Sequence, residues 1–277
     1  MPRYALRLYT DRLEPKAEIR LGCCNRVVYV RDGDAIVRAG AHAAGLAANS
    51  AWYGGDAVAL TAGTGGATLL RWELVPFQLF AGNPVSSTFP DYLRQASPVP
   101  TIEPDPTAPP GPESWNGASR PSLEKQVGTA LAAESAAPGG MTGPGVTSST
   151  TLAHAVELEH PDGHLIRCDR VDFPPGGIAY AHVHRGPGIR CLLAGSLRVE
   201  VNGKAHDIAP GGAWFEAGPD PVLALASKAG PTAFVRVMIL PRELLGKSSI
   251  RYLKPEDAEK PKLQTYRIFV DETIELP

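Results

Sequence analysis

The stretch Leu197-Arg198-Val199-Glu200-Val201-Asn202-Gly203 predicts a β-hairpin. Its apolar residues alternate with charged ones, which is the period of a strand with one buried face. Asn-Gly is the preferred dipeptide for a tight hairpin turn, because both residues tolerate positive φ. The stretch Pro210-Gly211-Gly212-Ala213-Trp214-Phe215 reads as a second turn that leads into another strand, and apolar runs follow at 222–226 and 234–240. Several short strands joined by Gly/Pro turns are typical of an all-β sandwich or barrel.

The first 80 residues repeat this plan. Three segments match in the same order: Tyr29-Val30-Arg31-Asp32-Gly33 with Cys191-Leu192-Leu193-Ala194-Gly195, Gly54-Gly55-Asp56-Ala57-Val58 with Pro210-Gly211-Gly212-Ala213-Trp214, and Leu70-Arg71-Trp72-Glu73-Leu74 with Val235-Arg236-Val237-Met238-Ile239. An internal repeat of this kind predicts a duplicated all-β domain.

Proline and glycine separate the two repeats. Residues 98–112 are rich in proline and residues 138–145 in glycine, a composition typical of a linker. Leu123, Val127 and Leu131 recur every four residues and predict a short helix inside that linker. The expected organisation is therefore a barrel at 1–80, a linker at 81–150, a second barrel at 151–245 and a tail at 246–277. The tail ends in a strand pattern that must pair with a barrel or with a partner subunit, so a homodimer is one expectation.

Composition and charge argue against several classes of partner. Lys+Arg number 27 against 29 Asp+Glu, so no global positive field attracts nucleic acid or an anionic membrane. No apolar run approaches the ~18 residues of a membrane span. The N-terminus lacks the apolar core of a secretory signal, which favours a cytoplasmic protein. The four cysteines show neither a CxxC zinc spacing nor a disulfide framework. A small-molecule ligand is the expected partner.

Ala181-His182-Val183-His184 is the strongest candidate for chemistry. Residues two apart in a strand point to the same face, so both imidazoles can bind one metal ion. The alternative is two histidines on a polar strand face without a metal.

The order of Gly177, the His182-Val183-His184 triplet, Gly195, the Asn202-Gly203 turn and the 210–215 segment resembles the cupin superfamily. Together with the duplication, it makes the chain similar to a bicupin. The resemblance implies two double-stranded β-helix barrels of jelly-roll type, often with iron, manganese, nickel or zinc inside. Cupin activities include dioxygenases, isomerases, epimerases and decarboxylases, and some cupins are storage or sensor proteins without an activity. Fold analogy leaves the reaction open.

The resemblance implies that His182 and His184 are metal ligands, but two other ligands are missing. The usual glutamate falls at Gly188, and the usual second-motif histidine falls near Val222. A stable site normally needs three protein ligands. We expect Glu216 to be the third, because two histidines and one carboxylate serve many oxygen-activating iron enzymes. The alternatives for Glu216 are a solvent-facing strand end or an ion pair with one of two arginines, Arg190 and Arg236.

Arg190 is the candidate for binding substrate, since a guanidinium can hold a carboxylate through two hydrogen bonds. Its alternative is a structural ion pair. In the N-terminal repeat, the positions of the His pair and of Gly188 hold Arg20, Gly22 and Arg26, so that half lacks a metal motif. It is expected to serve packing, dimerisation or a metal-free pocket, with Arg20, Arg26 and Arg31 as a possible anion site.

Two main hypotheses follow for function. The first is a metal-dependent small-molecule enzyme, dioxygenase-like or isomerase-like, acting on a carboxylate, enol or carbonyl compound in the C-terminal barrel. The second is a non-catalytic binding or sensor module of the cupin type. A third, mainly structural role requires the His pair to be incidental.

Overall fold

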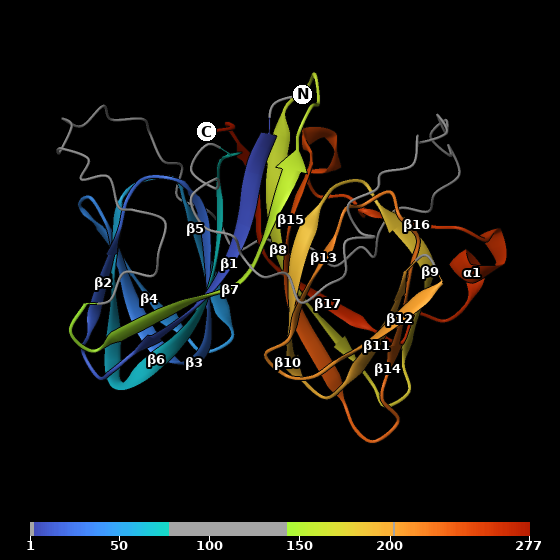
Figure 1. The fold of residues 1–277 in the computed structure, drawn as a ribbon, viewed down its shortest axis with the longest axis horizontal. Coiled ribbons are helices and arrows are strands. Elements are labelled where there is room, and N and C mark those ends of the chain that lie inside the picture. The colour runs from blue at the N-terminus through green and yellow to red at the C-terminus, as the bar shows by residue number, and fades with distance from the viewer. Residues whose placement is uncertain (1–2, 78–142, 202) are drawn as a thin grey trace.

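The computed structural model describes residues 3–77, 143–201 and 203–277, and in these residues the protein is almost entirely β (Figure 1). The strands are β1 (Arg3–Leu13), β2 (Glu18–Leu21), β3 (Asn25–Ala39), β4 (His42–Ala47), β5 (Ser50–Gly54), β6 (Val58–Pro76), β7 (Val146–Glu157), β8 (His164–Phe173), β9 (Ile178–His184), β10 (Gly188–Ala194), β11 (Leu197–Val201), β12 (Lys204–Ile208), β13 (Ala213–Glu216), β14 (Val222–Ala226), β15 (Thr232–Pro241), β16 (Ile250–Tyr252) and β17 (Thr265–Ile274). A single 3-10 turn, Arg242–Leu244, follows β15, and a short α-helix, α1 (Pro255–Glu259), precedes β17. The helix predicted around Leu123 lies outside the described residues. Within the described ranges, no helix has the length and apolar character needed to cross a membrane.

The N-terminal half is one antiparallel sheet of seven strands that bends on itself. Its main order is β4-β3-β6-β1-β7, with β2 paired to β6 and β5 paired to β3. The long strands β3 and β6 change register around Gly33, where φ is 77°. A Cβ at Gly33 would lie 2.1 Å from the Gly66 carbonyl oxygen, so the bend requires glycine there. The bent sheet encloses an apolar core that includes Val28, Leu60 and Leu69.

The strand β7 completes this sheet from the far side of the linker. It pairs with β1 over its whole length, from Arg3↔Glu157 to Leu13↔Val146. The predicted boundary at residue 150 therefore falls inside a strand of the N-terminal sheet. The stretch Ser148-Ser149-Thr150 carries no apolar alternation that would have assigned it to a partner about 140 residues earlier.

The C-terminal half is a barrel of two five-stranded antiparallel sheets, as predicted. Their orders are β13-β10-β15-β8-β17 and β12-β11-β14-β9-β16. The predicted hairpin is confirmed, since β11 pairs with β12 from Val201↔Lys204 to Leu197↔Ile208. Between the sheets lies an apolar core that includes Leu192, Trp214 and Phe234.

The register of the two halves agrees with two of the three sequence matches. The matched residues Tyr29 and Leu70 pair with each other in the N-terminal half, as Cys191 and Val235 do in the C-terminal half. The third match is out of register. Val28 pairs with Trp52 as Arg190 pairs with Trp214, so β5, and not residues 54–58, takes the place of β13. Similar glycine-rich turns next to these strands produced the misalignment.

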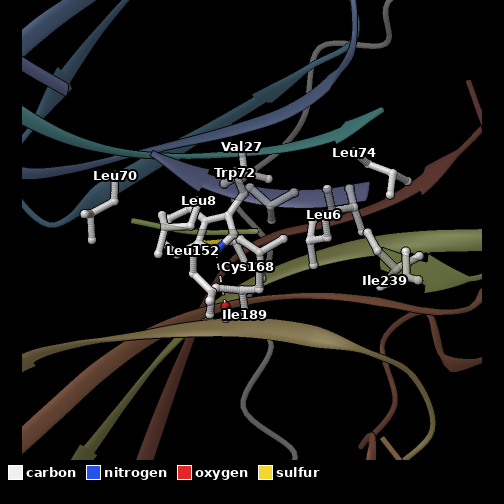
Figure 2. Close-up of a cluster of buried hydrophobic side chains, with 14 of the residues drawn as sticks. Leu6, Leu8, Val27, Leu70, Trp72, Leu74, Leu152, Cys168, Ile189 and Ile239 are labelled. Atoms are coloured by element: carbon white, nitrogen blue, oxygen red, sulfur yellow. Dashed lines mark hydrogen bonds between the residues drawn. The ribbon is translucent and has the colours of Figure 1, made fainter. Parts of the chain in front are cut away.

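The outer face of the β8/β10/β15 sheet packs on the N-terminal sheet and forms a shared apolar core (Figure 2). The side chains labelled there include Leu6, Leu8 and Trp72 from the first half and Cys168 and Ile189 from the second. The Trp72 indole N–H donates to the Ile189 carbonyl oxygen at 3.2 Å.

The tail joins both halves. Its strand β17 pairs with β8, while the side-chain amide of Asn25 donates to the Glu275 carbonyl oxygen at 2.7 Å. The Phe269 ring lies 5.6 Å from the Tyr29 ring between centroids. The tail strand therefore pairs with the C-terminal barrel, and the tail also contacts the N-terminal half.

Candidate functional site

Strand alternation directs a set of polar side chains into the C-terminal barrel. On β10, Ile189 and Cys191 belong to the core shared with the N-terminal half, so Arg190 points inward together with Leu192. The same argument applies to β8, β13 and β15, whereas His182 and His184 on β9 are placed by their contacts with each other and with Arg236. The inward residues are Asp169 on β8, His182 and His184 on β9, Arg190 on β10, Glu216 on β13 and Arg236 on β15, and each is at most 9% exposed. The structure thus brings together all four predicted site residues.

The two histidines face each other. Their Nε2 atoms are 3.2 Å apart. His182 Nδ1 lies 2.7 Å from the Tyr180 carbonyl oxygen, which can only accept, so Nδ1 carries the proton and Nε2 a lone pair. His184 Nε2 lies 3.4 Å from Arg236 NH1, a group that can only donate, so this nitrogen also offers a lone pair. The two unprotonated nitrogens therefore face each other, and the Arg236 guanidinium lies beside that of His184.

Burial keeps both imidazoles neutral. It lowers the pKa of His182, and it lowers the pKa of His184 well below the usual value of 6.5, helped by the guanidinium groups of Arg236 and Arg190. Neutral imidazole is the metal-binding form. Two nitrogens bound to one ion at about 2.0–2.1 Å lie roughly 2.9–3.4 Å apart in octahedral or tetrahedral geometry. The His pair therefore fits two positions of a transition-metal site.

Glu216 lies beside the pair but is held by other groups. Its Oε1 accepts from the Trp214 indole N–H at 2.8 Å. Its Oε2 lies 2.6 Å from Arg190 NH2 and 3.6 Å from His184 Nε2. Within residues 3–77, 143–201 and 203–277, no three His, Cys, Asp or Glu side chains are grouped so as to hold a metal ion. The third ligand position is thus not assembled in this arrangement, and Glu216 makes the ion pair with Arg190 that the sequence left as an alternative.

Gly188 explains how Arg190 fits inside the barrel. A Cβ at Gly188 would lie 2.9 Å from Arg190 NH1 and 2.6 Å from the Val237 carbonyl oxygen. The Gly188 carbonyl oxygen accepts from Arg190 NH1 at 2.6 Å. The position where the resemblance led us to expect a glutamate therefore provides room for an arginine. Full burial lowers the pKa of Arg190 to about 10.

Arg236 and Asp169 form a second buried ion pair. Two guanidinium nitrogens of Arg236 donate to the two Asp169 oxygens, at 2.6 and 3.0 Å. Sequence reasoning considered Arg236 only as a partner of Glu216 and did not single out Asp169. The available signal was the alternation in Asp169-Arg170-Val171-Asp172-Phe173, which puts Asp169 on the same strand face as the apolar Val171 and Phe173. With neutral histidines, the two arginines and two carboxylates give the cluster no net charge.

A small cavity borders Glu216. Its volume is about 10 Å³, the room for about one water molecule. The lining residues are Val201, Phe215, Glu216, Ala217, Asp220 and Val222. Val222, where a second-motif histidine was expected, is therefore an apolar wall next to the carboxylate.

The N-terminal half does not assemble the proposed anion site. Arg20 pairs with Glu18 at 2.8 Å, Arg26 with Glu73 at 2.8 Å and Arg31 with Asp32 at 3.5 Å. Arg20 lies on β2, whereas Arg26 and Arg31 lie five residues apart on β3, and each has its own carboxylate partner.

The N-terminal half does contain a buried ion pair like that of the C-terminal barrel. Arg71 Nε and NH2 donate to the two Asp11 oxygens at 2.6 and 2.9 Å. In the shared register, Arg71 takes the place of Arg236.

Comparison with known proteins bears on the fold. No protein-family model matches the sequence, and no curated protein matches it. Several solved structures do match this chain. A variant of Bacillus subtilis oxalate decarboxylase is 12% identical over 89% of this chain and 71% of its own, with a TM-score of 0.50. The fold is the cupin fold. The cupin 2 conserved barrel domain protein from Leptotrichia buccalis is 11% identical over 86% of this chain and 85% of its own, with a TM-score of 0.42. AerE from Microcystis aeruginosa is 9% identical over 87% of this chain and 88% of its own, with a TM-score of 0.45.

Proposed function

We propose that this cupin-fold protein is a metal-dependent small-molecule enzyme, dioxygenase-like or isomerase-like, with its site in the C-terminal barrel. His182 and His184 would hold iron, manganese, nickel or zinc, and Glu216 would complete the ligand set. The substrate would be a small carboxylate, enol or carbonyl compound. The observation that carries this proposal is the 3.2 Å approach of two imidazole lone pairs beside two buried arginines.

Each residue of the site has a part in this mechanism. A metal ion held by His182 and His184 would supply a positive charge able to polarise a substrate oxygen. Arg190 provides guanidinium donors that bind and orient the substrate carboxylate. The Tyr180 carbonyl fixes the ring orientation and tautomer of His182, as an outer partner commonly does for a metal-binding histidine. Asp169 holds Arg236 next to His184, so the positive side of the site stays in place.

Elemental analysis of protein purified without a His-tag tests the metal site. We expect near-stoichiometric metal in the wild-type protein and its loss in His182→Ala, together with loss of turnover in a dioxygenase and isomerase screen. His206→Ala is the matched control, because His206 lies half-buried on β12 and outside the cluster. Equal metal in wild type and His182→Ala, or none in wild type after reconstitution, would contradict the proposal.

A binding or sensor module is the second candidate. It is favoured by the engagement of Glu216 with Arg190, which leaves the third metal-ligand position unassembled among the described residues. On this reading, removal of metal leaves ligand-induced thermal stabilisation unchanged. A thermal shift that disappears with the metal would support the enzyme instead.

We also propose that the two barrels arose by duplication, as in a bicupin, and that the N-terminal barrel serves packing. The shared register of β3/β6 and β10/β15 supports this. The protein is proposed to be a cytoplasmic homodimer that binds neither nucleic acid nor membranes. Light scattering on the purified protein tests the dimer, and a monomer mass would contradict it.

A further inference from the structure

Residues 249–266 of the tail cover the buried cluster of the C-terminal barrel, on the side where Figure 1 shows β16 and α1. Three of their side chains lie against three side chains of the cluster: Ser249 Oγ is 3.4 Å from His184 Nδ1, the Tyr252 ring centroid is 6.3 Å from that of His182, and the Tyr266 ring centroid is 5.8 Å from Arg236 Cζ. The three covered residues are at most 5% exposed, whereas Tyr266 is 44% exposed. This part of the tail therefore lies between the cluster and solvent.

Strand pairing attaches this cover at both of its ends. At one end, β16 pairs with β9 up to Tyr252↔His182. At the other end, β17 pairs with β8 from Thr265↔Asp172 onward. Residues 253–264 connect the two strands and contain the short helix α1.

These connecting residues bond mainly to one another. Lys262 Nζ donates to three carbonyl oxygens within residues 257–260. In the part of the chain that the structure describes, every hydrogen bond of residues 254–264 stays within the tail. Apolar burial adds little, since Leu253 and Leu263 are 47% and 60% exposed. The stretch is therefore a unit with few bonds to the barrel beneath it.

Side chains of this stretch hold both covering rings in place. Lys262 Nζ lies 4.4 Å from the Tyr252 ring centroid, and the Gln264 side-chain amide donates to the Tyr266 hydroxyl at 3.2 Å. Gln264 Oε1 is buried without a hydrogen-bond partner among the described residues, a cost that contact with water removes. Movement of the stretch would therefore free both rings and satisfy this oxygen.

Two lysines hold the stretch on the barrel. Lys260 Nζ lies 4.6 Å and Lys262 Nζ 5.6 Å from the ring centroid of Tyr180 on β9. A cation next to an aromatic ring is a weak contact where water reaches it, and Lys260 is exposed. The Tyr180 carbonyl oxygen accepts from His182 Nδ1, so these contacts lie next to the candidate site.

We infer that residues 253–264 form a lid that opens as a unit, releases the rings of Tyr252 and Tyr266, and lets a small molecule reach His182 and Arg236. Only weak contacts break in this motion, because the strands at both ends of the lid stay paired. The lid goes beyond the proposed function and involves no metal ion. It serves an enzyme and a binding module alike, since either one needs a path to residues that are at most 5% exposed.

Acylation by diethyl pyrocarbonate tests the lid, because this reagent modifies neutral imidazoles that it can reach. Peptide mass spectrometry follows each histidine, at low reagent concentration and with a chelator present. In the wild-type protein, we expect His182 to react at least about tenfold more slowly than the exposed His42, because the closed lid protects it. The double variant Lys260→Gln with Lys262→Gln should speed the reaction of His182 about tenfold, because it removes contacts that only the closed lid makes.

Two controls complete the test. Lys254→Gln removes an exposed lysine at the start of the lid that makes no side-chain capping bond to α1, so it should keep the wild-type rate. His164 reports on unfolding of the barrel, because it is 6% exposed and pairs with Ile274, at the end of β17 away from the lid. Its rate should be the same in every variant. Lys262→Gln alone should speed the reaction of His182 less than the double variant does.

Three outcomes would overturn the lid. His182 could react as fast as His42 in the wild-type protein, which would mean that nothing covers it. Its rate could be equal in the wild type and the double variant, which would mean that the lysines do not hold a lid closed. A parallel rise at His164 would mean that the whole barrel unfolds instead. Because the readout needs neither metal nor turnover, each of these outcomes leaves the proposed function to its own test.

Discussion

Glu73 in the N-terminal barrel contributes stability that depends on pH. It lies 2.8 Å from Arg26 and 2.6 Å from Arg71. Burial by itself raises the pKa of Glu73, but the two guanidinium groups outweigh it and lower the pKa below 4.5. Because the pKa of Glu73 is lower in the folded protein than in the unfolded chain, its ionised carboxylate contributes its full stabilisation above pH 4.5. This contribution is lost as the pH falls through the pKa of Glu73 in the folded protein.

We therefore expect Glu73→Gln to lower the free energy of unfolding by about 3 kcal/mol at pH 7. The difference from wild type should shrink as the pH falls below 4.5. Urea unfolding between pH 7 and pH 3 measures this, and Glu200→Gln at the exposed pair with Arg198 is the control. A difference that stays constant with pH would show that the carboxylate charge is not the cause.

Asp169 and Arg236 should behave as a unit. Asp169→Asn leaves the guanidinium buried without its charge partner, which should cost about 3–5 kcal/mol of unfolding free energy. The double variant Asp169→Leu with Arg236→Met removes both charges and should recover much of that loss. Denaturant unfolding of the single and double variants checks the prediction. An additive loss in the double variant would mean that packing, and not the unpaired charge, sets the effect.

At the scale of the element, glycines with positive φ hold the corresponding bends of the two halves. Gly33 and Gly195 have φ values of 77° and 76°. A Cβ at Gly195 would lie 2.4 Å from Thr232 Oγ1 and 2.5 Å from the Pro231 carbonyl oxygen. Gly195→Ala should therefore lower the free energy of unfolding by more than about 2 kcal/mol, because the left-handed backbone and the steric clash both oppose the new side chain.

Gly40→Ala is the matched control for this prediction. Gly40 has a φ of 56° but nothing within 4 Å of an added Cβ. Gly40→Ala should lower the free energy of unfolding by only ~1–2 kcal/mol, the cost of the left-handed backbone. Equal unfolding free energies for the two variants in denaturant titrations would remove the steric part of the argument.

The strands and hairpins also show how much of the fold could be predicted from the sequence. Alternation is local, so the 197–208 hairpin and the shared face of His182 and His184 could be read directly. Pairing between distant strands is not local, which is why the place of β7 and the register of β5 were missed. The sequence indicated that Glu216 points into the barrel. Its ion pair with Arg190 could not be predicted, because Arg190 lies on the neighbouring strand and its side chain fits only where Gly188 leaves space.

At the scale of the whole molecule, the two halves share one apolar core, so they should unfold together. Trp72 is fully buried in that core, and its indole N–H reaches the Ile189 carbonyl oxygen of the other half (Figure 2). Trp72→Ala should lower the free energy of unfolding by about 3–5 kcal/mol, as expected for a large side chain removed from a core.

Because β10 carries Ile189 on one face and Arg190 on the other, the same change should increase amide exchange in both halves. Hydrogen exchange followed by mass spectrometry checks this, with Trp72→Phe as the milder variant. Wild-type protection of β10 and β15 in Trp72→Ala would show that the C-terminal barrel holds its site without support from the N-terminal half.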